Sequence, residues 1–362
     1  MATKRWWVLG CVVVVVAASA LAVAQLRKRD FQAICGGAVQ ENSLRYAIGD
    51  GGIKASDVDE LDSELPFGRL SECRASAEDD STGLTVAVGN LESSSMMSEL
   101  SGHRDLTGLS GTSAPLGGGW PGVLTVKNKD IAYATVVLKC GRSAPHEGIL
   151  VNVKQMLVEG EGNFSSDKRK RLKLAQSGAA IASDVSKKWE CGSQLGGEVD
   201  RAPDDVAVNK PLPLSQATGT CRAMRPLAAT AKKWGIARAA STGSDSRAPA
   251  QDCVLSNSKG DRVYRLSALY GPLEAGFRKS SSSLFQVSGK AGRKEKTPGW
   301  AWAGAKCPDG SDAALFTASS IEHSKENKRL IVGAEFETKM LGAFARDLGG
   351  RRGCDDPSLP AG

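Results

Sequence analysis

Eight cysteines offer the most regular chemistry in this chain: Cys35, Cys73, Cys140, Cys191, Cys221, Cys253, Cys307 and Cys354. No two of them form a CxxC pair, so the ligand spacing of zinc ribbons and of thioredoxin-like redox sites is missing. An even number of thiols in an exported chain is typical of disulfides. Cys11, inside the apolar N-terminal run, is interpreted as a membrane-embedded thiol.

The connectivity of eight thiols cannot be deduced from spacing alone. We predict sequential pairing: Cys35–Cys73, Cys140–Cys191, Cys221–Cys253 and Cys307–Cys354. Each bridge would then join a helix to the strand segment beside it. Chain-entropy arguments give each bond about 3 to 4 kcal/mol before strain, which would compensate for a core that is poor in aromatic residues.

Other reactive side chains form weak patterns. His103, His146 and His323 are not paired at helical spacing, so we expect surface histidines. The SxxK matches at Ser165 and Ser256 lack the partner elements of penicillin-binding enzymes. The carboxylates between Asp57 and Glu64 suit a solvated helical surface better than a glycosidase cleft. We therefore predict no catalytic residue, no cofactor and no metal.

Two glycine–tryptophan segments need a separate interpretation. The segment 117–122, GGGWPG, resembles a phosphate loop but lacks GK[ST] and precedes a strand. A matching Pro298-Gly299-Trp300 precedes a strand later in the chain. Both are interpreted as a turn followed by a core tryptophan, with a ligand-stacking platform as the alternative.

The strongest local charge is the basic cluster Lys168, Arg169, Lys170 and Arg171. One interpretation is the solvated first turn of a helix. The other is contact with an anionic membrane or envelope polymer. Cations are mildly unfavourable at a helix N-terminus, which favours a function for them.

The cysteines fall into two sets of four with matching neighbourhoods. An Ala-rich helical stretch follows Cys35 and Cys221, an alternating strand follows Cys73 and Cys253, and Cys140 and Cys307 each close a strand. A helix with apolar residues at threes and fours precedes the last cysteine of each set: Leu172, Ala175, Ala179, Ala182, Val185 and Trp189, then Phe336, Met340, Phe344 and Leu348. Ser166 or Asp167 is the expected N-cap of the first.

These patterns predict an α+β protein of two duplicated, disulfide-stapled domains, each a mostly antiparallel sheet packed by helices. The first covers 27–195 and the second 212–354, with a linker over 196–211 and a disordered tail over 355–362. A chance alignment of the four cysteines is the alternative to duplication.

The N-terminus carries an uncharged apolar run. Nineteen residues from Trp6 to Ala24 would span roughly 28 Å as a helix, close to a bilayer's hydrocarbon thickness. We predict a cytoplasmic stub over 1–5 and a transmembrane helix over 6–26. The alternative is a cleaved signal peptide, because Ala22-Val23-Ala24 precedes Gln25 as a small-x-small pattern.

The distribution of charge and the cysteines together predict the cellular location of the protein. Five basic residues flank the apolar run and account for most of the net charge of +7, so the rest of the chain is nearly neutral and shows no nucleic-acid signature. Four disulfides require an oxidising compartment. We therefore expect a single-pass protein of the cell membrane, with its N-terminus cytoplasmic and its C-terminus extracellular.

The Trp-Trp-Val start with its valine run, the Ala/Gly/Arg-rich composition, and the segments TVVLKCG and WAGAKCP carry a family resemblance. The chain resembles uncharacterised membrane-anchored extracytoplasmic proteins of high-GC actinobacteria. The resemblance is architectural and implies no activity and no functional residues.

Two functions follow as hypotheses. The first is a non-enzymatic module that binds a cell-envelope polymer or a surface protein. The second is a divergent envelope hydrolase, which would need His103 or His146 to meet an acid and a serine in one cleft.

Overall fold

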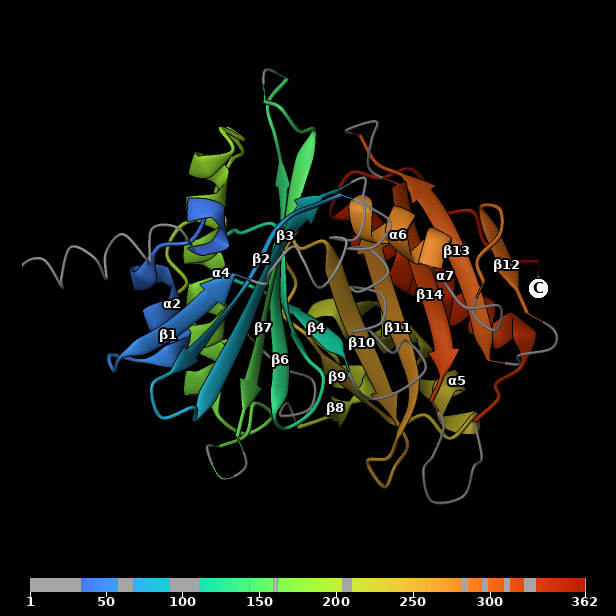
Figure 1. Cartoon of the computed structure of the whole chain (residues 1–362). Helices are drawn as coiled ribbons and strands as arrows, with labels where there is room; N and C mark the ends of the chain where they lie inside the picture. The colour runs from blue at the N-terminus through green and yellow to red at the C-terminus, as the bar shows by residue number, and fades with distance from the viewer. Residues whose placement is uncertain are drawn as a thin grey trace, which may run out of the picture.

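The computed structural model describes residues 34–57, 68–91, 111–142, 144–158, 160, 162–203, 210–280, 286–294, 299–308, 313–321 and 330–361. These residues form an α+β protein with two antiparallel sheets of seven strands each (Figure 1). We call residues 34–203 the first lobe and residues 210–361 the second lobe. Residues 1–33, with the predicted membrane anchor and Cys11, lie outside the described residues, and no helix among those described is long and apolar enough to cross a membrane.

The first sheet has the order β1-β2-β3-β7-β6-β5-β4. Its strands are β1 (Ile53–Asp57), β2 (Arg69–Ala77), β3 (Thr82–Asn90), β4 (Thr112–Pro115), β5 (Gly122–Val126), β6 (Ile131–Lys139) and β7 (Gly148–Leu157). The central strands β6 and β7 are almost wholly buried. Burial on both faces explains their continuous apolar sequences, because neither face has to be polar.

Helices cover one face of the first sheet. They are η1 (Ile34–Gly37), α2 (Glu41–Ile48) and α4 (Lys168–Lys188). The Asp167 carboxylate caps α4 by accepting from two backbone amides, as expected. Gly178 allows α4 to approach the sheet closely, because a Cβ there would lie 2.6 Å from the Cβ of Ala134.

The second sheet has the order β12-β13-β14-β11-β10-β9-β8. Its strands are β8 (Leu212–Pro213), β9 (Arg238–Ser241), β10 (Ala250–Ser256), β11 (Arg262–Tyr270), β12 (Ala291–Arg293), β13 (Trp300–Lys306) and β14 (Ala313–Ser320). The helices of this lobe are η2 (Leu214–Gln216), η3 (Gly219–Leu227), α5 (Ala228–Lys233), α6 (Pro272–Ser280) and α7 (Ala334–Gly350). All four apolar residues predicted for the last helix, Phe336, Met340, Phe344 and Leu348, are buried in α7.

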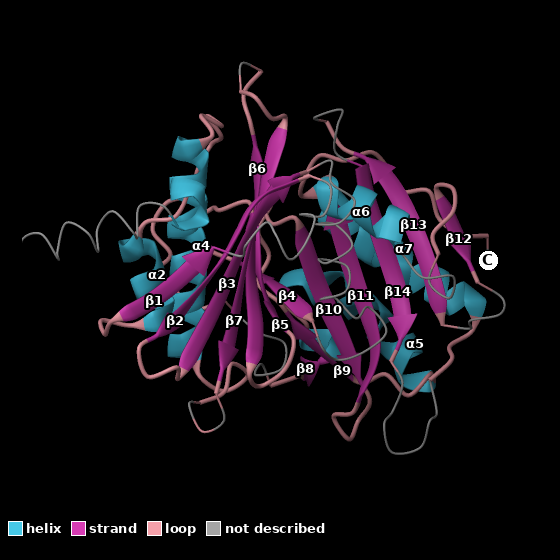
Figure 2. Cartoon of the chain, viewed as in Figure 1, coloured by secondary structure: helices cyan, strands magenta, loops and turns pink. Residues whose placement is uncertain are grey.

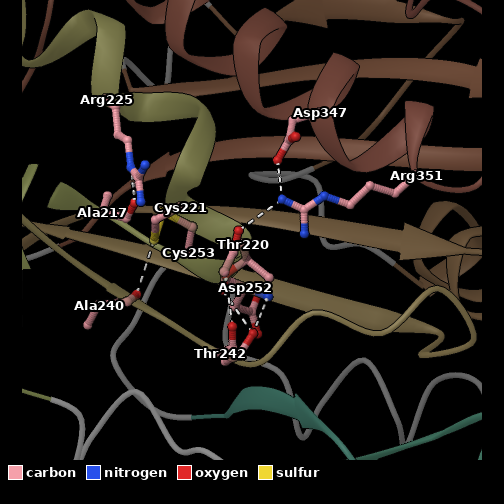
Figure 3. Close-up of a disulfide and its surroundings, with 11 residues drawn as sticks. Ala217, Thr220, Cys221, Arg225, Ala240, Thr242, Asp252, Cys253, Asp347 and Arg351 are labelled. Atoms are coloured by element: carbon pink, nitrogen blue, oxygen red, sulfur yellow. Dashed lines mark hydrogen bonds and ion pairs between the residues drawn. A yellow bond between two sulfur atoms is a disulfide. The ribbon is translucent and has the colours of Figure 1, made fainter. Parts of the chain in front are cut away.

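The four predicted disulfides are confirmed: Cys35–Cys73, Cys140–Cys191, Cys221–Cys253 and Cys307–Cys354. In each lobe the first bridge ties a 3₁₀-helix to the interior of a strand, and the second ties the end of a strand to the end of the long helix. Figure 3 shows the bridge between η3 and β10, where the hydroxyls of Thr220 and Thr242 both donate to the carbonyl of Asp252. Arg351 also donates to the Gly219 carbonyl there and ion-pairs with Asp347, which fastens α7 to the same helix.

The strand registers of the two sheets coincide. Cross-strand rows run through Cys73, Val86, Val153 and Ala134 in the first sheet, and through Cys253, Leu266, Ala318 and Ala301 in the second. The alanine that ends each row lies six residues before the next cysteine, Cys140 or Cys307. The two sheets therefore have the same register along these rows, across four strands.

The two sheets meet through the faces that α4 and α7 leave open. A shared apolar cluster joins Val123, Val137 and Leu150 of the first lobe to Ala250, Leu269, Leu273, Phe277, Trp300, Trp302 and Leu315 of the second. The edge strand β4 lies beside β10 (Figure 2), and α6 lies on this inner face of the second sheet, opposite α7. The lobes therefore form one continuous packed body.

A buried ion pair lies at this junction. The carboxylate of Asp252 in β10 accepts from the guanidinium of Arg265 in β11, and both side chains are fully buried. Asp252 also accepts from the backbone amide of Ser113, and Arg265 donates to the carbonyl of Gly111, at 2.7 Å and 2.9 Å. The pair therefore bonds to the first lobe through that lobe's backbone.

The ends of the second domain differ from expectation. The tail was predicted to be disordered, but Asp355 and Ser358 donate backbone hydrogen bonds to Lys306 and Gly304 of β13. Strand β12 does not pair with this part of β13, and the tail supplies backbone hydrogen bonds there instead. The described part of the linker is also packed, because Val199 lies in the core of the first lobe.

Candidate functional site

The basic cluster at the start of α4 is only partly available for surface contact. Arg171 is 1% exposed, and its guanidinium donates to the carbonyls of Phe164, Ser165 and Pro203. This corrects the prediction that Arg171 contacts an anionic surface. A buried guanidinium that donates its hydrogen bonds to backbone carbonyls cannot bind a polymer. Lys168 and Arg169 are exposed and Lys170 is half-buried, so their contact with an anionic surface stays a prediction.

The segment 117–122 is a turn followed by a core tryptophan, as predicted, whereas Pro298 of the second segment lies outside the described residues. Gly117, Gly118 and Gly119 all have positive φ, and a Cβ at Gly118 would lie 2.6 Å from the Glu198 carbonyl. Trp120 is buried, and its indole donates to the carbonyl of Gly197. The motif therefore receives the linker backbone and supplies a core side chain.

The reactive side chains considered for catalysis do not gather among the described residues. His103 and His323 lie outside those residues, and His146 is half-buried. Ser256 is buried in β10, while Lys259 of the same SxxK match is exposed in the next turn. Within the described part of the chain, no three His, Cys, Asp or Glu side chains are placed to hold a metal.

A cleft of about 450 Å³ opens at one end of the junction between the lobes. We call it the interlobe cleft. The first lobe lines it with Pro121, Val137, Lys139, Ser193 and Gln194, and the second lobe with Ser246, Arg247, Pro249, Tyr270, Gly271, Pro272 and Arg352. Its volume lies within the usual range for small-ligand sites.

Three cations line the interlobe cleft, from three distant segments. Lys139 ends β6, Arg247 lies in the loop between β9 and β10, and Arg352 follows α7. Among the described residues that line the cleft there is no carboxylate, imidazole or thiol. The wall of the cleft is therefore positive.

Two of these cations are held in place by the protein. The guanidinium of Arg352 lies 3.7 Å from the centre of the Tyr270 ring and donates to the carbonyl of Ala248. Arg247 donates across the cleft to the carbonyl of Gln194 at 2.6 Å, and so joins the two lobes. A side chain that is already ordered loses less entropy when a ligand binds.

Two residues that line the cleft have hydroxyls that are buried within the protein and do not open onto the cleft. The oxygens of Ser193 and Tyr270 have no hydrogen-bond partner among the described residues, and Tyr270 is 2% exposed. Burial raises the pKa of Tyr270 well above its usual value, although Arg352 and Arg351 oppose the shift. The hydroxyl therefore stays protonated at neutral pH and can donate a hydrogen bond.

No family model, curated protein or solved structure matches this chain.

The interlobe cleft presents positive charge and apolar walls from Val137 and three prolines. Such an arrangement can hold a ligand by charge and hydrogen bonding, and no proton acceptor for acid–base catalysis lies among the described lining residues.

The sequence did not point to these lining residues. They are scattered from Pro121 to Arg352, and no periodicity or motif links them. The only local signal is a basic residue close to a cysteine, as in Lys139 before Cys140 and Arg352 near Cys354.

Proposed function

We propose that this chain is a membrane-tethered extracytoplasmic module, built from two copies of one α+β unit, that binds an envelope polymer or surface protein in its interlobe cleft without catalysing a reaction. The observation that carries the proposal is the cleft itself. Its volume lies within the usual range for small-ligand sites, and its lining carries cations from both lobes, two of which are held by hydrogen bonds within the protein.

The duplication is supported by two independent features. The cross-strand rows that contain Cys73 and Cys253 have the same register over four strands. Both lobes also place their two disulfides at matching points of the fold. Convergence would have to reproduce the strand order, the register and the bridges together.

The location is supported by the sequence and by the disulfides. The apolar run over 6–26 is long enough for a transmembrane helix. Four disulfides are stable only in an oxidising compartment, so the two lobes belong on the outer side of the membrane. A ligand for the cleft would then be a component of the envelope or of the cell surface.

The proposal can be tested with a substitution that fills the cleft. Ser246 is exposed in the loop before β10 and lines the cleft, so Ser246→Trp should block the cleft without disturbing the core. The matched control is Ser258→Trp, in the exposed turn that follows the same strand. The full chain, purified in mild detergent and immobilised, is incubated with separated polymer and protein fractions of envelope extract.

We expect one fraction to be retained by the wild type and by Ser258→Trp, and to be lost from Ser246→Trp. A third variant, with Lys168, Arg169 and Lys170 changed to glutamine, tests the exposed basic cluster as a rival surface. Retention that survives Ser246→Trp and disappears with the glutamine variant would move the binding surface to α4 and overturn the cleft proposal.

A further inference from the structure

The outer strands of the first sheet have a face that is covered neither by α4 nor by the second lobe. Strands β1 and β2 lie on the side of the molecule away from the second lobe (Figure 1). A groove of about 470 Å³ runs over this face. We call it the sheet groove, and it is lined by Lys54, Ala55, Ser56, Arg74, Ala75, Ser76, Gly83, Leu84, Thr85, Lys154 and Met156.

One cross-strand row carries most of the charge of the sheet groove. Ser56, Arg74, Thr85 and Lys154 lie opposite one another in the neighbouring strands β1, β2, β3 and β7. Arg74 is exposed and Lys154 is half-buried, and neither forms an ion pair or a hydrogen bond within the described part of the chain. Neighbouring strands are about 4.8 Å apart, so the backbones that carry the two cations are separated by roughly 10 Å. The Thr85 hydroxyl lies between them.

Among the described residues that line the sheet groove there is no carboxylate. Of the carboxylates close by, Asp80 lies 3.5 Å from the third cation, Lys54. Glu72, two residues before Arg74 in β2, forms an ion pair with Arg69. Glu78 lies against Gly52, in the turn beyond the end of β2. The charge of Arg74 and Lys154 is therefore left uncompensated at this face by the described residues.

The matching row of the second sheet is buried. It consists of Ala240, Val254, Arg265 and Ser319, each at most 3% exposed. There β4 of the first lobe lies beside β10, and Arg265 donates to the carbonyl of Gly111. The same face is thus a contact surface in the second lobe, whereas in the first lobe it is open and carries two cations.

We propose that the sheet groove binds an acidic polysaccharide, with Arg74 and Lys154 pairing with carboxylates of its sugars and with Ser56 and Thr85 bonding to its hydroxyls. This site is separate from the interlobe cleft and does not depend on the function proposed for the cleft. A guanidinium can hold a carboxylate through two parallel hydrogen bonds. Two cations roughly 10 Å apart can meet two charges of one chain, and the first contact then favours the second.

The composition of the sheet groove favours a polysaccharide over a protein or a membrane. Its one exposed large apolar side chain is Met156, and no aromatic residue lines it among those described. Protein interfaces depend on aromatic or large apolar anchors, and membrane-surface helices insert apolar side chains. A polar floor with cations and hydroxyls instead matches a charged chain that is rich in hydroxyls.

The test uses the full chain in an uncharged detergent, titrated by calorimetry with four probes. They are tetragalacturonate for the acidic chain, D-galacturonate for its single unit, maltotetraose as the uncharged chain, and tripolyphosphate as a phosphate source. We expect tetragalacturonate to bind more tightly than D-galacturonate and tripolyphosphate, and maltotetraose not to bind. Affinity should fall as salt is raised, because charge pairs near the surface are screened.

Substitutions then assign the binding groups. The double variant Arg74→Gln, Lys154→Gln should weaken tetragalacturonate about tenfold or more, the usual scale for hydrogen bonds to charged groups. The matched control is Lys187→Gln, Lys188→Gln, which removes the same charge from exposed positions in the last turn of α4, and it should bind like the wild type. Thr85→Glu places a carboxylate between the two cations and should abolish binding, whereas Thr85→Gln, of similar size and uncharged, should keep most of the affinity.

A further variant tests the acidic residues that follow β1 in the sequence. Asp59, Glu60, Asp62 and Glu64 lie outside the described residues. With all four changed to the corresponding amides, the affinity for tetragalacturonate should equal or exceed that of the wild type, because nearby negative charge only competes with the ligand. A weaker affinity in this variant would contradict binding by the cations of the sheet groove.

The outcomes separate this site from the interlobe cleft. If maltotetraose binds as well as tetragalacturonate, or if the Arg74, Lys154 double variant binds like the wild type, the sheet groove is not the site. Tighter binding of tripolyphosphate than of tetragalacturonate would overturn the carboxylate assignment. Should Ser246→Trp abolish the binding while the double variant keeps it, the acid belongs to the interlobe cleft and the present inference fails. Loss in the double variant with full binding by Ser246→Trp would support the sheet groove, whatever the cleft binds.

Discussion

Arg265 of β11 and Asp252 of β10 form a diagonal pair, because Asp252 lies opposite Ser267 and Arg265 lies opposite Val254. The guanidinium Nη2 is 2.9 Å from a carboxylate oxygen, and neither side chain is exposed to solvent. The same two side chains bond to the backbone of β4 and of the turn before it. The second lobe thus provides the charges, and the first lobe provides backbone groups that complete their hydrogen bonding.

Asp252→Ala should therefore lower the stability of the fold and weaken the contact between the two lobes. Removing one partner leaves a buried cation uncompensated, and we expect the free energy of unfolding to fall by about 3–5 kcal/mol. Urea unfolding followed by fluorescence and by circular dichroism would measure the loss. The double variant Asp252→Leu, Arg265→Met should recover part of it, and a single variant that unfolds like the wild type would show that the pair is not important for stability.

The two buried tyrosines of β11 should respond in opposite ways when their hydroxyls are removed. The hydroxyl of Tyr264 donates to the buried Glu337 at 3.0 Å, whereas that of Tyr270 has no partner among the described residues. Tyr264→Phe should lower the free energy of unfolding by about 1–3 kcal/mol, and Tyr270→Phe should leave it unchanged or raise it. Equal losses for the two variants would mean that the Tyr270 hydroxyl has a protein partner.

Stability should fall at alkaline pH. Burial is the largest cause that raises the pKa of both Tyr264 and Tyr270, and the neighbouring Glu337 adds to the shift of Tyr264. Above the ordinary tyrosine pKa of about 10, the unfolded chain loses protons that the folded chain keeps, so the unfolded state gains stability at about 1.4 kcal/mol per pH unit for each tyrosine.

Below that pH the contribution of both tyrosines is fully present. Urea unfolding at a series of pH values above 9 would reveal the slope, with tyrosinate absorbance as the direct signal. Tyr264→Phe and Tyr270→Phe should each make the slope shallower, and Tyr46→Phe, at a side chain that is 47% exposed, is the control for losing a tyrosine. A slope that none of the variants alters would contradict this account.

Loss of the Cys140–Cys191 bridge should weaken both the fold and the cleft. The bridge closes a loop of 51 residues, for which chain entropy gives roughly 4 kcal/mol. Ser193 and Gln194 lie two and three residues after Cys191 and line the cleft, and Lys139 precedes Cys140. In the variant with both cysteines changed to serine, we expect a lower melting temperature and weaker retention of the envelope fraction that the wild type binds. The variant with Cys35 and Cys73 changed to serine, away from the cleft lining, should show the first effect and not the second.

The membrane anchor can be tested on the native material. If residues 6–26 span the bilayer, the chain should stay in the membrane pellet after an alkaline carbonate wash, and mass spectrometry should find the N-terminal peptide. A mature protein that begins at Gln25 and is released to the medium would favour the signal-peptide alternative. Replacing Val14 with Arg should abolish stable insertion of an anchor, because a cation at the centre of a spanning helix is expensive.

Elements with a strong local pattern could be predicted from the sequence. Strands β3 and β11 alternate in polarity. The long helices repeat apolar residues at every third or fourth position, as in α7 from Phe336 to Leu348. Strands β1 and β9 were not predicted, because they are short and largely polar or small. The stretch after Cys221 begins as a 3₁₀-helix rather than an α-helix, and it includes Pro226, which cannot donate a backbone hydrogen bond.

The interlobe cleft could not be predicted in this way. Its lining residues come from segments as far apart as Lys139 and Arg352, and only the packing of one sheet against the other brings them together. The bond between Arg247 and the Gln194 carbonyl likewise depends on the docking of the two lobes. Neither relation leaves a trace in local composition or spacing.

Because the two sheets share a register, a substitution in one sheet can be compared with the substitution at the matching position of the other. Because the row through Cys73 and the row through Cys253 coincide position by position, a substitution at Val86 has its counterpart at Leu266, and one at Val153 has its counterpart at Ala318. Each pair compares the same place in two different surroundings, within one chain and under one set of conditions. Differences within such pairs would report how strongly each sheet depends on its own neighbours.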